Sequence, residues 1–375
     1  MFDYSNLDID TPCYVCEQKL LENNLKILKD IKEKSGAKIL LALKGFSFYH
    51  FEPFISNYLD GCCASGLWEA RLSNEEFKKQ THTFSPAYKE EDIDEIIDIS
   101  NHVVFNSFSQ WQKYKSRAIG KTSPGIRINP ECSASPKEIY NPCARYSRFG
   151  VTLKEFDENL LDGIEGFHIH ALCEQGADEL EVVLETFEKN FGRFIHKMKW
   201  VNLGGGHHIT KDGYDRQKLI DMIKEFKTKY KVDVYLEPGE AVGWQCGVLV
   251  CSVIDIVYNE MKIAILDTSA EAHMPDTIIM PYRSDVRNAS KSGVKKYTYR
   301  LTGNTCLSGD IMGDYSFDKA LNIGDKIVFE DQIHYSIVKN TTFNGIKLPS
   351  IAMIDKNGEY KVLKKYLYED FKRRI

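Results

Sequence analysis

At residues 38–46 the chain reads Lys-Ile-Leu-Leu-Ala-Leu-Lys-Gly-Phe, a short apolar run that is bounded by lysines and stopped by a glycine. A run of this length without polar alternation predicts a strand buried on both faces, as in a parallel sheet. Lys44 then stands where the strand ends. A lysine held there is partly desolvated, which favours the neutral amine that forms Schiff bases. Taken alone, such a stretch more often contains a lysine that only leads the chain into solvent.

A helical pattern at residues 19–28 precedes this strand, and seven further apolar runs follow it with amphipathic stretches between them. The runs lie at residues 61–64, 82–84, 103–105, 125–128, 166–170, 200–203 and 234–236. Strands that alternate with helices form right-handed βαβ units and a parallel sheet, and eight such units are the content of a (β/α)8 barrel. We therefore predict an α/β fold with a (β/α)8 barrel at residues 15–241. A doubly wound sheet is the alternative.

After Gly239 the pattern changes to strands separated by turn residues, at 248–253, 262–266, 297–300 and 326–329. This change predicts a second, mostly β domain at residues 242–375, joined by residues 1–14. The proline-containing segment 129–150 predicts a loop over one end of the barrel.

The composition points to a small-molecule partner. Of the 375 residues, 43% are hydrophobic, and 49 basic against 54 acidic residues give a net charge of −5. This charge is too mild for nucleic-acid binding. The first six residues lack the pattern of a secretion signal, and polar residues interrupt the most apolar later segment, 242–257. We expect a cytoplasmic protein that does not span a membrane.

Ten cysteines are scattered along the chain, which favours reduced thiols over a disulfide framework. Cys13-x-x-Cys16 has no second pair at zinc-site spacing, so we expect no metal there.

Chemistry in such a barrel lies at the carboxyl ends of the strands, and phosphate commonly binds after strands seven and eight. The predicted strands end at Lys44, at His168-Ile169-His170, at Gly204-Gly205-Gly206 and at Glu237-Pro238-Gly239. Glycines let backbone N–H groups approach a phosphate, although three glycines alone more often mark a tight turn. Together these residues suit pyridoxal phosphate, which needs a lysine, a phosphate site and an acidic partner for its ring nitrogen.

In this interpretation Lys44 binds the cofactor, Glu237 faces the pyridine nitrogen and His170 packs on the ring. The competing interpretation is a metal site in a barrel hydrolase, built from His168, His170 and the pair His207-His208. It leaves Glu237 and the β domain without a role.

The motifs resemble those of the fold-type III pyridoxal-phosphate decarboxylases, which include ornithine and diaminopimelate decarboxylases. Besides the segments around Lys44, His170, Gly204–Gly206 and Glu237–Gly239, the resemblance covers Cys306-Leu307-Ser308-Gly309-Asp310 and Ile333-His334-Tyr335 with the following segment 341–345. It implies an alanine racemase-like barrel with a C-terminal β domain, and a homodimer with shared active sites. It also implies that Tyr335 contacts the phosphate, that Cys306 is the general acid, and that Cys306 and Asp310 come from the partner subunit.

Two departures from the pattern concern the substrate. The ornithine and diaminopimelate types carry arginine after Glu-Pro-Gly, where this chain has Glu240, and an acidic residue where it has Leu307. Reversing the charge at 240 disfavours a substrate with a second carboxylate and favours a cationic tail. Glu271 and Asp276 add carboxylates where family members contact the distal end of the substrate.

In this form the chain resembles the carboxynorspermidine/carboxyspermidine decarboxylase branch. The resemblance implies decarboxylation of these compounds to norspermidine and spermidine, with Glu240, Glu271, Asp276 and Asp310 in contact with substrate. The alternatives are a diaminopimelate or ornithine-type decarboxylase, an amino-acid racemase of the same fold and a non-enzymatic pyridoxal-phosphate carrier. Racemases of that type place arginine rather than a residue like Glu237 on the ring nitrogen, and the carrier lacks a second domain.

Overall fold

The computed structural model describes residues 2–4, 7–133, 135 and 138–375. It divides into two compact units, one formed by residues 24–242 and the other by residues 1–23 together with 243–375. The predicted division began the barrel at residue 15, whereas the unit begins at Asn24, inside helix α1 (Gln18–Ser35). The predicted loop segment 129–150 contains one short 3-10 turn, Glu138–Tyr140, and its residues 134 and 136–137 lie outside the described part.

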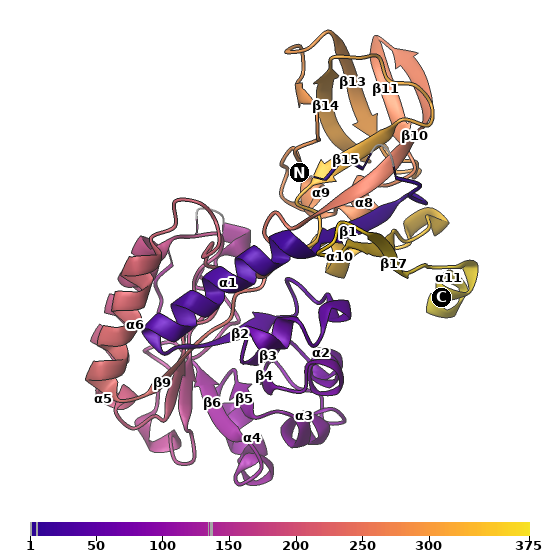
Figure 1. The fold of residues 1–375 in the computed structure, drawn as a ribbon. Coiled ribbons are helices and arrows are strands. Elements are labelled where there is room, and N and C mark those ends of the chain that lie inside the picture. Colours follow the sequence, from indigo (N-terminus) through magenta and orange to yellow (C-terminus); the bar gives the residue numbers. More distant parts are fainter. Residues whose placement is uncertain (1, 5–6, 134, 136–137) are drawn as a thin grey trace. The chain divides into compact units, whose positions relative to one another are not determined.

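The unit of residues 24–242 contains a closed barrel of parallel strands, β2 to β9 (Figure 1). The strands are β2 (Lys38–Ala42), β3 (Gly61–Ala64), β4 (Gln80–Phe84), β5 (His102–Phe105), β6 (Ser123–Arg127), β7 (Gly166–His168), β8 (Trp200–Asn202) and β9 (Asp233–Leu236). The barrel closes where Lys38 and Ile39 of β2 pair with Tyr235 and Leu236 of β9. The eight predicted strands are therefore confirmed, and the doubly wound alternative is wrong because an open sheet would leave β2 and β9 as edges.

Helices connect the strands and lie outside the barrel (Figure 1). They are α2 (Leu67–Leu72), α3 (Ile93–Ile99), α4 (Phe108–Ala118), α5 (Ala177–Ile195) and α6 (Arg216–Tyr230), and the short α7 (Glu240–Gly243) follows β9. Helix α5 shows why they form, because Leu180, Val183, Leu184, Phe187 and Phe191 recur at helical spacing and are all buried.

Large aromatic side chains fill the barrel near the amino ends of its strands. Gly125 and Gly166 make room for the indole of Trp200, since a Cβ atom on either glycine would lie 2.4 Å or 2.1 Å from that ring. His82 and His102 stack beside it with ring centroids 3.8 Å apart. The interior is thus a packed core, and an active site that a substrate can reach must lie at the ends of the strands.

The other unit is built on a nine-stranded sheet in the order β12-β14-β13-β11-β10-β1-β16-β17, with β15 paired to β10. Its strands are β1 (Cys13–Glu17), β10 (Gly247–Asn259), β11 (Met261–Leu266), β12 (Ser290–Lys291), β13 (Tyr297–Thr302), β14 (Ile311–Phe317), β15 (Lys326–Glu330), β16 (Ser350–Ile354) and β17 (Tyr360–Lys364). Short helices α8 (Ala270–His273), α9 (Asp276–Ile279), α10 (Ser336–Lys339) and α11 (Tyr368–Arg374) complete it. The N-terminal strand β1 thus lies between β10 and β16, inside the C-terminal sheet. The nine strands of this sheet confirm the predicted mostly β unit.

Among the described residues, no helix has both the length and the apolar character needed to cross a membrane.

Candidate active site

The Lys44 turn packs against the Glu-Pro-Gly turn. Strand β2 ends at Ala42, whose N–H donates to the carbonyl of Pro238 at 3.0 Å, and Lys44 lies in the following turn with its side chain exposed. Gly45 permits the contact, because a Cβ atom there would lie 3.1 Å from the nitrogen of Glu240. Residues almost two hundred positions apart in the sequence therefore meet at one end of the barrel, as predicted from the strand ends.

Glu237 is a largely buried carboxylate, 12% exposed, with a donor on each oxygen. Asn202 donates its Nδ2 hydrogen to Oε1 at 2.6 Å, and His168 Nε2 lies 3.3 Å from Oε2. Burial raises the pKa of the Glu237 carboxyl, but the neighbouring His168, these hydrogen bonds and the charge of Lys44 outweigh burial and lower the pKa overall. Glu237 is therefore ionised at neutral pH.

His168 is neutral beside this carboxylate. Burial lowers its pKa, and the attraction of Glu237 only partly opposes that effect. Because the ionised carboxylate can only accept, His168 must carry its proton on Nε2 and donate it to Glu237. Its Nδ1 atom has no hydrogen-bond partner among the described residues.

His170 is fixed by the glycine loop after β8. Its Nδ1 accepts the N–H of Gly205 at 3.0 Å, and burial holds the pKa of the imidazole well below its usual range. The ring is thus neutral, with its orientation set by the backbone. A flat ring held in this way suits packing on the face of a planar ligand.

The three glycines after β8 are required by close backbone approach. A Cβ atom would lie 2.5 Å from the carbonyl oxygen of Ile169 at Gly204, 2.1 Å from that of Glu237 at Gly205 and 2.1 Å from that of Leu172 at Gly206. The N–H of Gly204 already donates to Asn202 Oδ1 at 2.8 Å, and the N–H of Gly205 to His170. Of the predicted phosphate cradle, the half-buried Gly206 is the glycine whose N–H has no acceptor among the described residues.

Arg127, at the end of β6, is a buried cation that the sequence did not reveal. It is 4% exposed, and its guanidinium lies 4.5 Å from the ring centroids of both Phe84 and Phe149. Its Nη2 donates to the carbonyl of His170 at 3.1 Å. Burial lowers the pKa of Arg127 to about 10, so it remains charged at neutral pH. No carboxylate within ion-pair distance is found in the described part of the chain, and a bound anionic group would compensate this charge.

The charge of Lys44 acts on two further titratable groups, Glu69 and Cys63. The Glu69 carboxylate accepts the N–H of Ser65 at 2.6 Å, and burial raises its pKa although the charge of Lys44 opposes the rise. Burial likewise raises the pKa of the Cys63 thiol well above its usual range. Cys63 lies near the end of strand β3 and Glu69 in helix α2, which follows that strand, and this place at the carboxyl end of a barrel strand was the signal that could have identified them.

Glu240 lies beside His208, with Oε2 of the carboxylate 3.6 Å from Nε2 of the imidazole. Both side chains are largely buried, at 17% and 11% exposure. Glu240, the predicted substrate contact at the start of α7, therefore has the imidazole of His208 as a neighbour.

The remaining predicted residues belong to the unit with the nine-stranded sheet. Cys306 is exposed on a turn, where its N–H donates to Asn344 Oδ1 at 2.6 Å. Asn344 lies in the segment predicted to follow Tyr335, so the structure brings these two motifs together.

Asp310 is 3% exposed and holds this turn from within. Its Oδ1 accepts the N–H of Ala270 at 2.6 Å and the hydroxyl of Ser269 at 3.1 Å, and its Oδ2 accepts the hydroxyl of Thr305 at 2.6 Å. The carboxylate is thus engaged by the chain itself, and its evident role is to join the Cys306 turn to helix α8. Direct contact between Asp310 and substrate stays a prediction.

The other acidic residues differ in their environment. Asp276 forms an ion pair with Lys339, whereas the Oε2 atom of Glu271 is buried without a hydrogen-bond partner among the described residues. Tyr335 adopts a positive φ of 42° and lies one turn before Lys339. A positive φ is unusual for a residue with a Cβ atom and is typical of functional segments.

The histidines do not support the metal alternative. Among the described residues, no group of three or more His, Cys, Asp or Glu side chains could hold a metal ion. The ring nitrogens face separate partners instead, since His168 points to Glu237, His170 to Gly205 and His207 Nδ1 to the hydroxyl of Tyr214 at 3.3 Å.

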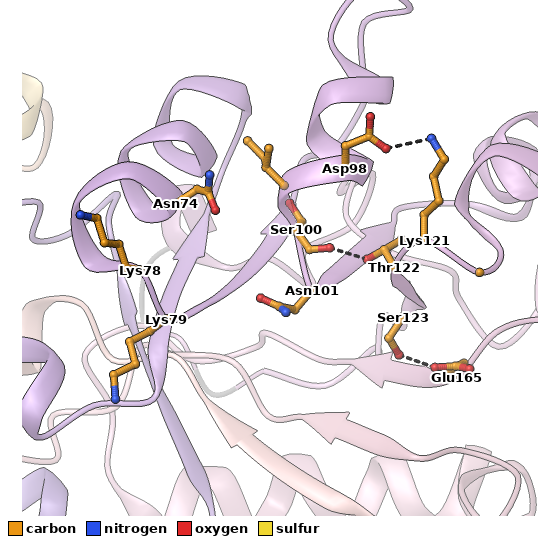
Figure 2. Close-up of a pocket in the computed structure, with 12 residues that line it drawn as sticks. Asn74, Lys78, Lys79, Asp98, Ser100, Asn101, Lys121, Thr122, Ser123 and Glu165 are labelled. Carbon is orange, nitrogen blue, oxygen red and sulfur yellow. Dashed lines mark hydrogen bonds and ion pairs between the residues drawn. The ribbon is translucent and has the colours of Figure 1, made fainter.

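An open cavity of about 720 Å³ lies at the amino ends of the strands, away from these residues. Figure 2 shows that some of its polar groups are paired with each other, as Lys121 is with Asp98 and Ser123 with Glu165. We assign it no part in the chemistry.

The chain matches the model of the family "Pyridoxal-dependent decarboxylase, C-terminal sheet domain" over residues 13–332. It is 55% identical over 377 residues to the carboxynorspermidine/carboxyspermidine decarboxylase of Campylobacter jejuni subsp. jejuni serotype O:6 (strain 81116 / NCTC 11828), with 98% of each chain covered. It is 42% identical to the carboxyaminopropylagmatine decarboxylase of Synechocystis sp. (strain ATCC 27184 / PCC 6803 / Kazusa), with 98% of this chain and 96% of the relative covered.

The fold agrees with these similarities. The crystal structure of carboxynorspermidine decarboxylase from Campylobacter jejuni, complexed with norspermidine, superposes with a TM-score of 0.93 at 54% identity, covering 98% of this chain and 100% of that one. The buried carboxylate of Glu237, the exposed amine of Lys44 and the glycine loop fit the cofactor of this family. The chain therefore belongs to the pyridoxal-dependent decarboxylases, and its cofactor is pyridoxal phosphate.

Proposed function

We propose that this protein decarboxylates carboxynorspermidine and carboxyspermidine to norspermidine and spermidine. The observation that carries the proposal is the packing of the Lys44 turn on the Glu-Pro-Gly turn, which brings an exposed amine to the end of the barrel where its charge acts on the ionised carboxylate of Glu237. The 55% identity to the Campylobacter jejuni decarboxylase of that name supports the choice of substrate.

The barrel residues provide the cofactor site in this proposal. When bound, pyridoxal phosphate supplies a sink for the electron pair released when the carboxylate leaves the substrate carbon. Lys44 provides the amine that holds it, and Glu237 provides a buried negative charge for the proton on its ring nitrogen. The imidazole of His170, which is held in place by its hydrogen bond to Gly205, packs against the cofactor ring. The N–H of Gly206, the backbone at Gly239 and the Tyr335 segment are the proposed phosphate contacts.

Cys306 is the proposed donor of the proton that replaces the departing carboxylate. Its exposure fits a thiol that works in the active site of a partner subunit, because such a site would cover it. This role requires a homodimer with shared active sites, which we include in the proposal. The ten free cysteines suit a cytoplasmic location, where thiols stay reduced.

The acidic residues define the substrate class. Glu240, Glu271 and Asp276 provide carboxylates for the ammonium groups of a polyamine tail, and charge-assisted hydrogen bonds of this kind are strong when partly desolvated. A second candidate is a carboxylated compound with a guanidinium end, favoured by the 42% identity to the carboxyaminopropylagmatine decarboxylase. Diaminopimelate decarboxylases are more distant, at 23% identity for that of Haemophilus influenzae over 65% of this chain.

The test compares Lys38, which begins strand β2, with Lys44 in the turn after it. Lys44→Ala should abolish carbon dioxide release from carboxynorspermidine together with the visible absorbance of the bound cofactor. Lys38→Ala, which removes an ion pair with Asp233 at the other end of the strand, should retain both. A Lys44→Ala protein with normal turnover would refute the proposal.

A further inference from the structure

The carboxylate of Asp276 is occupied by a lysine of the same chain. Lys339 Nζ lies 2.9 Å from Oδ1 and 2.7 Å from Oδ2, so both oxygens accept from one ammonium group. The same Nζ lies 4.6 Å from the ring centroid of Tyr335. A carboxylate together with an aromatic face is the combination that recognises an alkylammonium ion.

The fold places these groups by local hydrogen bonds. The N–H of Lys339 donates to the carbonyl of Tyr335 at 2.9 Å, which puts the ammonium and the ring on the same turn of α10. The hydroxyl of Tyr14, which is fully buried, donates at 2.6 Å to the carbonyl of His273 in α8 and also lies 3.3 Å from that of Ser336 in α10. The buried hydroxyl of Tyr14 thus joins helix α10, which carries Lys339, to helix α8, which leads to Asp276.

The Asp276 carboxylate accepts no hydrogen bond from the backbone among the described residues, so it does not hold a turn or a helix end. Among the described residues, Lys339 is the one group that donates to its oxygens. Asp355 in the same unit is different, because its Oδ1 also accepts the backbone N–H groups of Asn357 and Glu359 and so holds a turn. Breaking the Asp276–Lys339 pair would therefore leave the backbone intact.

The pair is also accessible and weak. Lys339 is 35% exposed and Asp276 is 22% exposed, so water can solvate both ions when they separate. Pairs of this exposure contribute little to stability, because water screens both charges. A ligand ammonium can replace the lysine without leaving a buried charge uncompensated, because the carboxylate is paired before and after the exchange.

We propose that Lys339 is an internal substitute for the substrate. Its side chain is a four-carbon alkylammonium that pairs with the carboxylate of Asp276 until an ammonium group of a polyamine displaces it. This inference rests on the proposed function for the identity of the ligand. It makes Lys339 a residue that weakens polyamine binding and Asp276 the residue that confers it. The exchange favours ligands with a cationic end, since a distal carboxylate could not take the place of Lys339 on Asp276.

The test measures norspermidine binding to the full-length holoenzyme by calorimetry. Lys339→Met, which keeps the length of the side chain without its charge, should bind norspermidine about two- to fivefold more tightly than the wild type. Lys339→Arg should show no such gain, because it keeps a cation on Asp276. Lys361→Met, which removes the ion pair with Asp355 in the same unit, serves as the matched control and should leave the affinity unchanged.

A double variant identifies the carboxylate. Asp276→Asn should weaken norspermidine binding, and Lys339→Met in the Asp276→Asn background should give no gain. Unchanged or weaker binding by Lys339→Met, or a gain that persists without Asp276, would overturn the inference. Carbon dioxide release by the wild type is a separate readout, so a failure of the proposed function and a failure of the Lys339 inference can be told apart.

Discussion

The Nε2 atom of His168 lies 3.3 Å from Oε2 of Glu237, and Asn202 donates to the other oxygen at 2.6 Å. These donors keep a buried carboxylate ionised, although burial alone would raise its pKa. The negative charge that we propose for the ring nitrogen of the cofactor is therefore maintained by a neutral histidine and an amide, both at the carboxyl ends of neighbouring strands.

Replacing His168 by Phe removes one of the two donors while keeping an aromatic ring. Burial should then raise the pKa of Glu237, so that cofactor binding weakens as the pH falls and does so at a higher pH than in the wild type. We expect a loss of about tenfold in affinity at neutral pH, because hydrogen bonds to charged groups contribute about 1.5–3 kcal/mol. A titration of cofactor absorbance at several pH values measures this, with the exposed His196→Phe as control. An unchanged pH profile would contradict the role of His168.

Replacing Gly205 by Ala places a Cβ atom 2.1 Å from the carbonyl oxygen of Glu237. The loop must shift, which should cost about 1–3 kcal/mol in the free energy of unfolding and disturb the hydrogen bond to His170. Gly66→Ala is the control in the same unit, since nothing lies within 4 Å of the added atom. Chemical denaturation and cofactor titration check both effects, and equal behaviour of the two variants would show that the close approach has no consequence.

The strand pattern was sufficient to predict the barrel, the residues at its mouth and the existence of a β unit. Arg127 was not predicted because its charge stands inside the apolar run 125–128, which reads as an ordinary strand. The short helices α8, α9 and α10 have four residues each, too few for a helical period to show in the sequence. The pair between Asp276 and Lys339 could not be predicted either. These residues are 63 positions apart, and their contact depends on tertiary structure that no local pattern encodes.

Asp310→Asn tests whether Asp310 acts through position. The amide cannot accept all the donors that now converge on the carboxylate, so the Cys306 turn and helix α8 should lose their connection. We expect a loss of about 1–3 kcal/mol in the free energy of unfolding together with a lower kcat. Asp314→Asn breaks a surface ion pair with Arg300 in the same unit and should cost less than about 1 kcal/mol. Similar losses in the two variants would argue against the buried role of Asp310.

The stacked histidines in the barrel predict sensitivity to acid. Burial lowers the pKa of His102 to about 4, and burial with the neighbouring His102, His168 and Lys38 lowers the pKa of His82 well below its usual range. Below the ordinary histidine pKa of about 6.5, the unfolded chain therefore binds more protons than the folded chain. The stability present above this pH should be lost as the pH falls toward about 4.

His82→Phe should reduce this loss, since neither ring nitrogen of His82 has a hydrogen-bond partner among the described residues. The slope of unfolding free energy against pH should fall by up to about 1.4 kcal/mol per pH unit between pH 6.5 and 4. Denaturation at a series of pH values measures it, and His196→Gln, at an exposed position, should leave the slope unchanged. An identical slope for His82→Phe would contradict the assignment.

The most direct measurement is carbon dioxide release by the cofactor-loaded protein on carboxynorspermidine, carboxyspermidine, carboxyaminopropylagmatine, meso-diaminopimelate and L-ornithine. We expect the highest kcat/KM on the first two compounds, because Glu240, Glu271 and Asp276 offer carboxylates to a polyamine tail. A higher kcat/KM on meso-diaminopimelate or L-ornithine would leave the barrel chemistry of Lys44 and Glu237 in place and contradict the assignment of substrate.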